Sequence, residues 1–241
     1  MDAWEFERAI QDAVALRREE FEYGTALYND ELPRVYDANF VRFARAPHAA
    51  VISDLADELQ ASLGHRKVVL PESAAVAADE LRSRGWKLNT LVTMAYRGVG
   101  FPPGSAEIVD TEELRDARRH SLEDIQRDAD ATRQIVAFVE RMASVVPTTL
   151  FGARPRGVDE IGAFCCLFQR EGIGQIDEVT TVLRHRRQGL GDAVVRTAVS
   201  ASLAAGDSLC FLVADEADWP REWYSRLGFS VIARRYELLR T

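Results

Sequence analysis

Apolar and polar residues alternate with strand and helix periods along the chain, most clearly in its C-terminal part. Proline at position 220 suits the first turn of a short helix, and Gly228 is placed to end it. In chain order the pattern predicts a strand over residues 175–182, a helix over 192–201, a strand over 208–214, a helix over 219–227 and a strand over 229–233.

Upstream of this run, the same periodicities predict further elements of one domain. A partly helical apolar pattern covers residues 111–143 and includes Leu114, Ala117 and Ile125. Strands are predicted over residues 148–154 and 161–169, and a glycine-supported hairpin turn over 171–174 leads into the next strand.

The first hundred or so residues follow a similar plan. An amphipathic helix carries Trp4, Phe6, Ile10, Val14 and Leu16 between charged residues. The pattern then predicts a strand over residues 35–43, a helix over 49–63, a strand over 66–70, a helix over 73–84 and a strand over 86–97. Prolines and glycines interrupt both patterns in residues 98–105, which we interpret as a linker.

The junction between the strand at 175–182 and the helix at 192–201 contains the sequence Arg186-x-x-Gly189-x-Gly191. At such a junction the first backbone N–H groups of the helix have no partner, and the helix dipole adds partial positive charge. Glycines allow close approach to the main chain, and Arg184, Arg186 and Arg187 add side-chain charge. The segment is therefore predicted to bind a pyrophosphate.

The spacing of this loop lacks the third glycine of a dinucleotide-binding turn and the Gly-Lys-Ser/Thr ending of a P-loop. It resembles instead the pyrophosphate loop of the GNAT superfamily of acyl-coenzyme A-dependent N-acyltransferases. Downstream, Tyr224-x-x-x-Gly228-Phe229 resembles a second segment of that superfamily. The chain departs from the usual pattern at Leu183, where proline is common, at Arg184, where an acidic or polar residue is common, and at Ala217, where asparagine is common.

The resemblance implies an α/β fold with a mixed, mostly antiparallel central sheet flanked by helices. Residues 106–241 would form the catalytic domain, and residues 1–97 a smaller, degenerate GNAT-like companion, as in two-lobed actinobacterial members. It also implies acetyl-coenzyme A as the cofactor. The residues expected to bind it are Thr181, Val182, Leu183, Arg186, Arg187, Gln188, Gly189, Leu190, Gly191 and Asp192.

Amide formation requires a neutral amine and a stabilised or protonated thiolate leaving group. In the superfamily a carboxylate on the strand before the loop often acts as base, which favours Glu178, with Asp177 close behind; these neighbours are expected on opposite faces of the strand. An ordinary strand carboxylate paired with an arginine is the alternative. The resemblance assigns proton donation to the leaving sulfur to Tyr224, for which a half-buried packing role is the alternative.

Composition narrows the remaining possibilities. The chain has 241 residues and a formal net charge of −8, which argues against nucleic-acid binding. The basic cluster Arg118-Arg119-His120 is interpreted as a solvated helix face. The histidines and cysteines lack the spacing of a metal site, and Cys165, Cys166 and Cys210 are interpreted as buried thiols rather than as a covalent relay.

The sequence therefore predicts an N-acetyltransferase that moves an acetyl group to a primary amine of a small molecule or peptide by direct attack in a ternary complex. A non-catalytic coenzyme A-binding sensor or scaffold is the alternative. No bilayer-spanning run and no signal peptide are recognised, so we expect a cytoplasmic monomer or homodimer that does not bind membranes.

Overall fold

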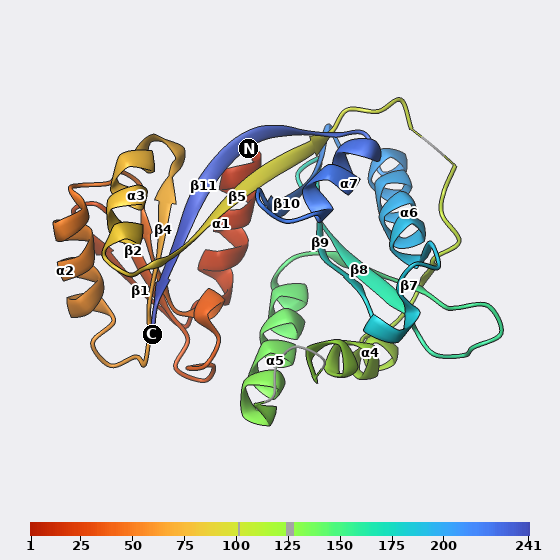
Figure 1. Ribbon diagram of the computed structural model, residues 1–241. Helices are drawn as coiled ribbons and strands as arrows, with labels where there is room; N and C mark the ends of the chain where they lie inside the picture. The colour runs from red at the N-terminus through yellow and green to blue at the C-terminus, as the bar shows by residue number, and fades with distance from the viewer. Residues whose placement is uncertain (101, 124–127) are drawn as a thin grey trace. The chain divides into compact units, whose positions relative to one another are not determined.

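The computed structural model describes residues 1–100, 102–123 and 128–241 (Figure 1). The chain forms two compact units that each combine segments from both ends of the sequence. The first unit comprises Met1–Ile10 and Ala95–Leu212, and the second comprises Gln11–Met94 and Val213–Thr241. The division at residues 97 and 106, drawn from the chain order alone, stays a prediction.

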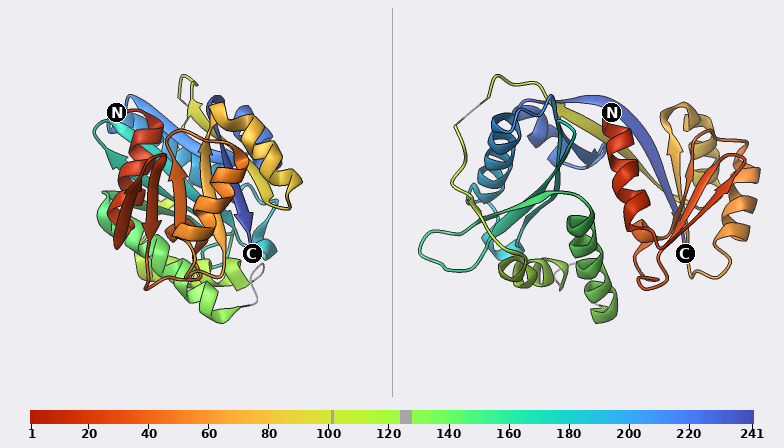
Figure 2. Two further views of the ribbon diagram at one scale, coloured as in Figure 1. Left: turned by 90° about the vertical axis from the view of Figure 1, so that its left-hand side faces the viewer. Right: turned by 180° about the vertical axis from the view of Figure 1, so that it is seen from behind.

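The first unit is a sheet between two layers of helices. Its strands β9 and β10 are parallel and the other neighbours are antiparallel. Helix α6 (Leu190–Ala204) covers one face, and α4 (Thr111–Glu123) and α5 (Ala129–Val145) lie on the other (Figures 1 and 2). The strand order is β10 (Leu209–Asp215, of which residues 209–212 belong here), β9 (Ile173–Thr181), β8 (Ala163–Arg170), β7 (Thr148–Ala153) and β6 (Glu107–Ile108).

Close packing of α6 on this sheet depends on small residues. A Cβ at Gly174 of β9 would lie 2.5 Å from Oγ of Ser202 in α6, so only glycine fits without displacement there. Ser202 Oγ donates a hydrogen bond to Asp207 at 2.7 Å. On β8, Cys165 is fully buried and its Sγ lies 3.6 Å from the carbonyl oxygen of Val194 in α6. The helix and the sheet therefore form one rigid layer pair.

The hairpin from β8 to β9 turns where it was predicted. Glu171 (φ 53°) and Gly172 (φ 75°) both have left-handed backbone, as a two-residue turn between twisted antiparallel strands requires. The predicted helix over residues 111–143 corresponds to α4 and α5. Ile125, which belonged to that pattern, lies outside the described residues, as does Phe101 of the predicted linker.

The second unit is a sheet with α2 (Ala49–Leu59) and α3 (Ala75–Ser83) packed on one face (Figure 1). Strands β3 and β4 are parallel and are joined through α2. The core between sheet and helices is formed by residues such as Ile52, Leu70 and Leu238. The strand order is β1 (Arg17–Phe21), β2 (Gly24–Tyr28), β3 (Phe40–Phe43), β4 (Arg66–Pro71), β11 (Phe229–Arg240) and β5 (Lys87–Tyr96, to residue 94 in this unit).

The remaining helices are short. Helix α1 (Ala3–Val14) begins in the first unit and ends in the second, and α7 (Pro220–Arg226) belongs to the second. The turns η1 (Tyr36–Ala38), η2 (Glu72–Ala74) and η3 (Leu183–His185) are 3-10 helices. No described helix is both long enough and apolar enough to cross a bilayer. The α/β fold with mostly antiparallel strands flanked by helices is confirmed.

Three predictions for the N-terminal residues differ from the structure. The helix ends at Val14, so Leu16 is exposed, and the charged run that follows forms the hairpin β1–β2, which the pattern did not predict. The helix predicted to residue 63 ends at Leu59, whose carbonyl oxygen accepts a hydrogen bond from the Tyr28 hydroxyl at 2.7 Å. The strand predicted over residues 35–43 starts only at Phe40.

Asn39 explains the late start of this strand. Its buried side chain accepts a hydrogen bond from the backbone N–H of Asn29 at 2.8 Å and donates to the carbonyl oxygens of Leu32 and Val35 at 2.8 and 3.0 Å. These bonds hold the preceding residues in a turn, since an asparagine amide competes well with a strand's backbone partners.

Replacing Asn39 by alanine is expected to lower the free energy of unfolding by about 1–3 kcal/mol, because the buried backbone N–H of Asn29 loses its acceptor and the carbonyl oxygens of Leu32 and Val35 each lose one of two hydrogen bonds. Urea denaturation followed by circular dichroism measures the change. The half-buried Asn89 of β5 makes no side-chain hydrogen bond among the described residues, and Asn89→Ala serves as the control. Equal stabilities of the two variants would contradict this role for Asn39.

Candidate active site

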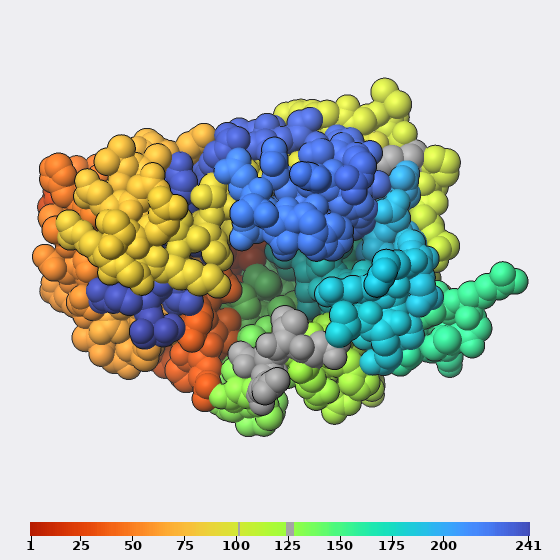
Figure 3. All heavy atoms as spheres, in the orientation of Figure 1, coloured from red at the N-terminus to blue at the C-terminus, as the bar shows by residue number. Residues whose placement is uncertain are grey.

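The segment between β9 and α6 lies at the surface of the first unit (Figure 3, cyan) and includes the 3-10 turn η3. Arg187 (φ 61°) and Gly189 (φ 77°) have left-handed backbone, and Gly189 is the N-cap of α6 without any side-chain hydrogen bond to the helix. No atom lies within 4 Å of where a Cβ of Gly189 would stand. The loop thus presents uncapped N–H groups at a helix N-terminus, the arrangement that binds phosphate and other anions.

Two neighbouring side chains of this loop, Arg184 and His185, are held by one carboxylate. Glu160, in the loop between β7 and β8, accepts hydrogen bonds from Arg184 at 2.6 and 3.2 Å and contacts Nε2 of His185 at 2.5 Å. Arg184, followed by His185, lowers the pKa of Glu160 to about 2, so this carboxylate stays charged across the neutral range. The contacts fix the start of the loop against the β7–β8 loop.

The next two arginines are left for a ligand. Arg186 and Arg187 are exposed, and neither forms an ion pair with any residue in the described part of the chain. Arg186 makes one long hydrogen bond, 3.4 Å from its Nε to the carbonyl oxygen of Thr181. The loop therefore combines uncapped backbone donors with two available guanidinium groups.

Strand β9 has a free edge next to this loop. Its parallel pairing with β10 runs from Ile173 with Leu209 to Gln175 with Phe211, while β9 continues to Thr181. Within the described residues, the part of β9 that follows Gln175 does not pair with β10. Backbone N–H and C=O groups at such an edge can pair with an extended, amide-containing ligand.

A β-bulge interrupts the other edge of β9, where it pairs with β8. Phe164 pairs with Thr180 but Cys166 pairs with Asp177, so the bulge gives β9 one residue more than β8. Glu178 lies in this bulge with a left-handed φ of 56°, which is uncommon for a residue with a long side chain. The simple alternation expected for Asp177 and Glu178 does not apply, because the extra residue breaks the strand period.

Glu178 is paired with an arginine of α4. Arg118 Nε donates to its two carboxylate oxygens at 2.7 and 3.0 Å, and Arg118 Nη2 donates to Oε2 at 2.7 Å. Burial raises the pKa of Glu178 above its ordinary value, and the hydrogen bonds and charge of Arg118 act in the opposite direction. This ion pair is the alternative that the sequence left open for Glu178, and it constrains the carboxylate without excluding proton transfer.

Asp177 makes local contacts in the same strand. Its Oδ1 accepts a hydrogen bond from the backbone N–H of Glu178 at 2.6 Å, and its Oδ2 accepts one from Gln175 Nε2 at 3.2 Å. The first of these bonds satisfies the backbone at the bulge. Both candidate carboxylates therefore lie in the first unit, on the strand that leads into the anion-binding loop.

Tyr224 lies in α7 of the second unit and is 6% exposed. Its ring packs edge-on against Phe229 at 5.9 Å between centroids and beside Trp223 at 4.8 Å. Gly228 ends the helix with a φ of 95°, as predicted. The aromatic contacts fix the ring, and the three candidate catalytic residues are divided between the two units.

Sequence reasoning missed Arg118 and Glu160. Arg118 was interpreted as part of a solvated basic cluster, but it is 2% exposed. The helical pattern could have indicated that Arg118 is buried, because Arg118 follows the buried Leu114 by four residues and therefore lies on the same face of α4. Glu160 had no comparable signal, since it lies in a loop.

The three cysteines belong to the core. Each is buried and free, and burial raises the pKa of Cys210 to about 11 and those of Cys165 and Cys166 further. A covalent relay needs an accessible thiolate, so these residues are unsuited to it.

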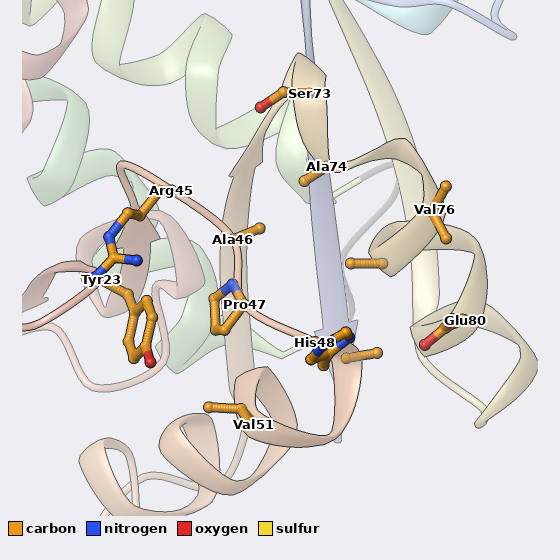
Figure 4. A pocket seen from close by; sticks show the side chains of 12 residues that line it. Tyr23, Arg45, Ala46, Pro47, His48, Val51, Ser73, Ala74, Val76 and Glu80 are labelled. Carbon is orange, nitrogen blue, oxygen red and sulfur yellow. The ribbon is translucent and has the colours of Figure 1, made fainter.

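A groove of about 470 Å³ lies in the second unit at the N-terminal ends of α2 and α3 (Figure 4). Its polar side chains, Arg45, His48, Ser73 and Glu80, surround alanine, proline and valine residues. None of the residues predicted to bind the cofactor or to catalyse transfer lines this groove.

Comparison with known proteins agrees with this geometry. Residues 152–238 match the model of the FR47-like protein family, a range that contains β9, the loop, α6 and Tyr224. No curated protein matches the chain in sequence.

Several solved structures share the fold over nearly the whole chain. A conserved protein of unknown function from Staphylococcus epidermidis has a TM-score of 0.75 and 13% identity, covering 98% of this chain and 96% of that one. A GCN5-related N-acetyltransferase from Kribbella flavida has a TM-score of 0.63 and 22% identity, covering 98% and 94%. A GNAT-family acetyltransferase from Colwellia psychrerythraea has a TM-score of 0.54 and 12% identity, covering 99% and 96%.

At these identities the structural likeness is one of fold. The chain has the GNAT fold, and its residues 152–238 are FR47-like in sequence.

Proposed function

We propose that the protein is an acetyl-coenzyme A-dependent N-acetyltransferase that acts on a primary amine of a small molecule or peptide. The observation that carries the proposal is the uncapped start of α6, with left-handed Gly189 and two available arginines, directly after a strand that bears two carboxylates. The GNAT fold and the FR47-like match support the same function.

The loop residues fit the cofactor they were predicted to hold. Backbone N–H groups of residues 188–192 and the side chains of Arg186 and Arg187 would bind the pyrophosphate. The free edge of β9, ending at Thr181 and Val182, would pair with the amide groups of the pantetheine arm. Leu183 is exposed beside them. Coenzyme A supplies the acetyl group as a thioester, which an amine can attack directly.

The transfer requires three proton movements. The ammonium form of the acceptor gives one proton to a carboxylate, for which we propose Glu178, with Asp177 as the second candidate. The free amine nitrogen then bonds to the acetyl carbon as the carbon–sulfur bond breaks. The nitrogen loses its second proton to water as Tyr224 donates a proton to the departing sulfur, and the tyrosinate regains a proton from solvent, which leaves an amide and a free thiol.

A non-catalytic coenzyme A-binding sensor or scaffold is the second candidate function. The ion pair between Glu178 and Arg118 favours it, because a carboxylate fixed by an arginine is a common structural element. The two functions differ in product formation, since only the enzyme releases thiol in the presence of an amine. We further propose a cytoplasmic monomer or homodimer, with residues 1–97 binding no coenzyme A.

Gly189→Glu is expected to weaken acetyl-coenzyme A binding at least roughly tenfold, equivalent to about 1.4 kcal/mol. The new carboxylate would repel the pyrophosphate, and its side chain would occupy the approach to the backbone donors. Isothermal titration calorimetry measures the affinity. Gly206→Glu is a matched control at the other end of α6, because Gly206 also has a left-handed φ (82°) and open space around it. Unchanged affinity in a folded Gly189→Glu protein would refute the cofactor site.

Arg186→Ala is expected to weaken acetyl-coenzyme A binding by about tenfold, as for the loss of a charge-assisted hydrogen bond. Arg184→Ala should have a smaller effect, because Arg184 is already held by Glu160. The difference should shrink as salt is raised, since exposed charges are screened. Calorimetry at two ionic strengths compares the variants, and a larger loss for Arg184→Ala would invert the assignment of the two arginines.

Tyr224→Phe is expected to lower turnover by roughly one to three orders of magnitude while the affinity for acetyl-coenzyme A changes little. The substitution keeps the ring contacts with Trp223 and Phe229 and removes only the hydroxyl group. Steady-state kinetics and calorimetry separate the two effects. Weaker binding at unchanged turnover would make Tyr224 a cofactor contact, and no change in either would leave it a packing residue.

A further inference from the structure

Arg118 is a buried cation whose side chain forms an ion pair with one carboxylate, that of Glu178. It is 2% exposed, while the side chain of Glu178 is 17% exposed. Three donor–acceptor contacts of 2.7, 2.7 and 3.0 Å join the guanidinium group to Glu178. An arginine in this position uses its planar fork to fix a carboxylate in both direction and distance, which a lysine cannot do.

The position of Glu178 makes this contact more than a stability element. Glu178 lies in a β-bulge with left-handed backbone, a conformation that costs free energy and needs support from its surroundings. The bonds from Arg118 use one lone pair of Oε1 and two of Oε2. One lone pair of Oε1 is left by this pattern, and the side chain still reaches solvent.

We propose that Arg118 is the positioning residue of the acyl-transfer site, which fixes Glu178 in the bulge so that the remaining lone pair of Oε1 can accept a proton. This inference rests on the proposed function, in which Glu178 accepts the proton of the amine. Arg118 itself would touch neither substrate nor cofactor, and acts through Glu178.

The charges around Glu178 are few. Asp177 precedes it on β9, where its carboxylate accepts hydrogen bonds from the backbone N–H of Glu178 and from Gln175. Cys165 and Cys166 on β8 have pKa values raised by burial and stay neutral. Glu140 of α5 forms its ion pair with Arg115 on α4. Among the described residues in contact with Glu178, Arg118 therefore supplies the positive charge.

The direction of the effect follows from these groups. Burial raises the pKa of Glu178, and Arg118 lowers it. Without Arg118 the effect of burial remains unopposed, so the pKa of Glu178 rises further. A larger fraction of Glu178 is then protonated at neutral pH, where it cannot serve as a base. Activity that depends on ionised Glu178 is regained as the pH is raised.

The test is the pH profile of kcat/KM for Arg118→Met, measured by thiol release from acetyl-coenzyme A. The acidic limb is expected to move to higher pH by about one to three units, the usual effect of removing one adjacent opposite charge. Arg118→Lys should shift it less, because a charge remains. Arg119→Met is the matched control on the same helix, since Arg119 is exposed and pairs only with carboxylates of α4 among the described residues. An unshifted limb in Arg118→Met would overturn the proposal.

A second measurement separates this inference from the proposed function. Carbon-13 NMR of the Glu178 carboxyl group, identified with Glu178→Gln, follows its titration without any substrate. A higher titration midpoint in Arg118→Met supports the positioning role, and an unchanged midpoint overturns it. Wild-type turnover in Glu178→Gln would instead refute Glu178 as the base, whatever the midpoint. If Arg118→Met does not fold, Arg118→Gln, which also removes the charge but keeps a polar side chain, is used for both measurements, and an unchanged limb and midpoint in that variant overturn the proposal.

Discussion

Left-handed backbone at Glu178 and at Gly189 is the constraint on which the candidate site depends. Glu178 has a φ of 56° and Gly189 a φ of 77°. The first marks the bulge that shifts the register of β9 against β8, and the second turns the chain into α6 without a side-chain cap. The conformation at Glu178 positions a carboxylate, and the conformation at Gly189 exposes backbone N–H donors; both residues lie in the continuous segment from β9 to α6.

The rest of the first unit stabilises these two conformations. Helix α6 packs on β7, β8 and β9 through small residues, and Gly174 permits the close contact with Ser202. On the opposite face, α4 supplies Arg118 to Glu178. At the start of the loop, Glu160 fixes Arg184 and leaves Arg186 for a ligand. The site is therefore built from a rigid layer pair with a few charged contacts at one end of β9.

The sequence alone predicted the turns, helix ends, strands and helices that depend on the local pattern of residues. Gly172, Gly189 and Gly228 each have positive φ, where a glycine-supported turn, loop or helix end was predicted. The strands β7 to β10 and helices α6 and α7 lie within a few residues of their predicted positions. The mixed, mostly antiparallel sheet followed from the same elements.

Features that depend on contacts between distant residues were not visible in the pattern. The hairpin β1–β2 begins with Arg17 and Arg18, which continue a helical charge pattern. Strand β3 starts at a later residue than predicted because the side chain of Asn39 forms hydrogen bonds with residues of the preceding turn. The bulge at Glu178 is a one-residue slip between strands, and the pairing with Arg118 joins residues sixty positions apart.

The central claim is that this site transfers an acetyl group and does not merely bind coenzyme A. The most direct measurement is thiol release from acetyl-coenzyme A by the purified protein over a panel of primary amines, with mass spectrometry of the products. The account predicts that at least one amine gives thiol and N-acetylated amine in equal amounts. Tight acetyl-coenzyme A binding without product from any amine in a broad panel of small molecules and peptides would contradict it.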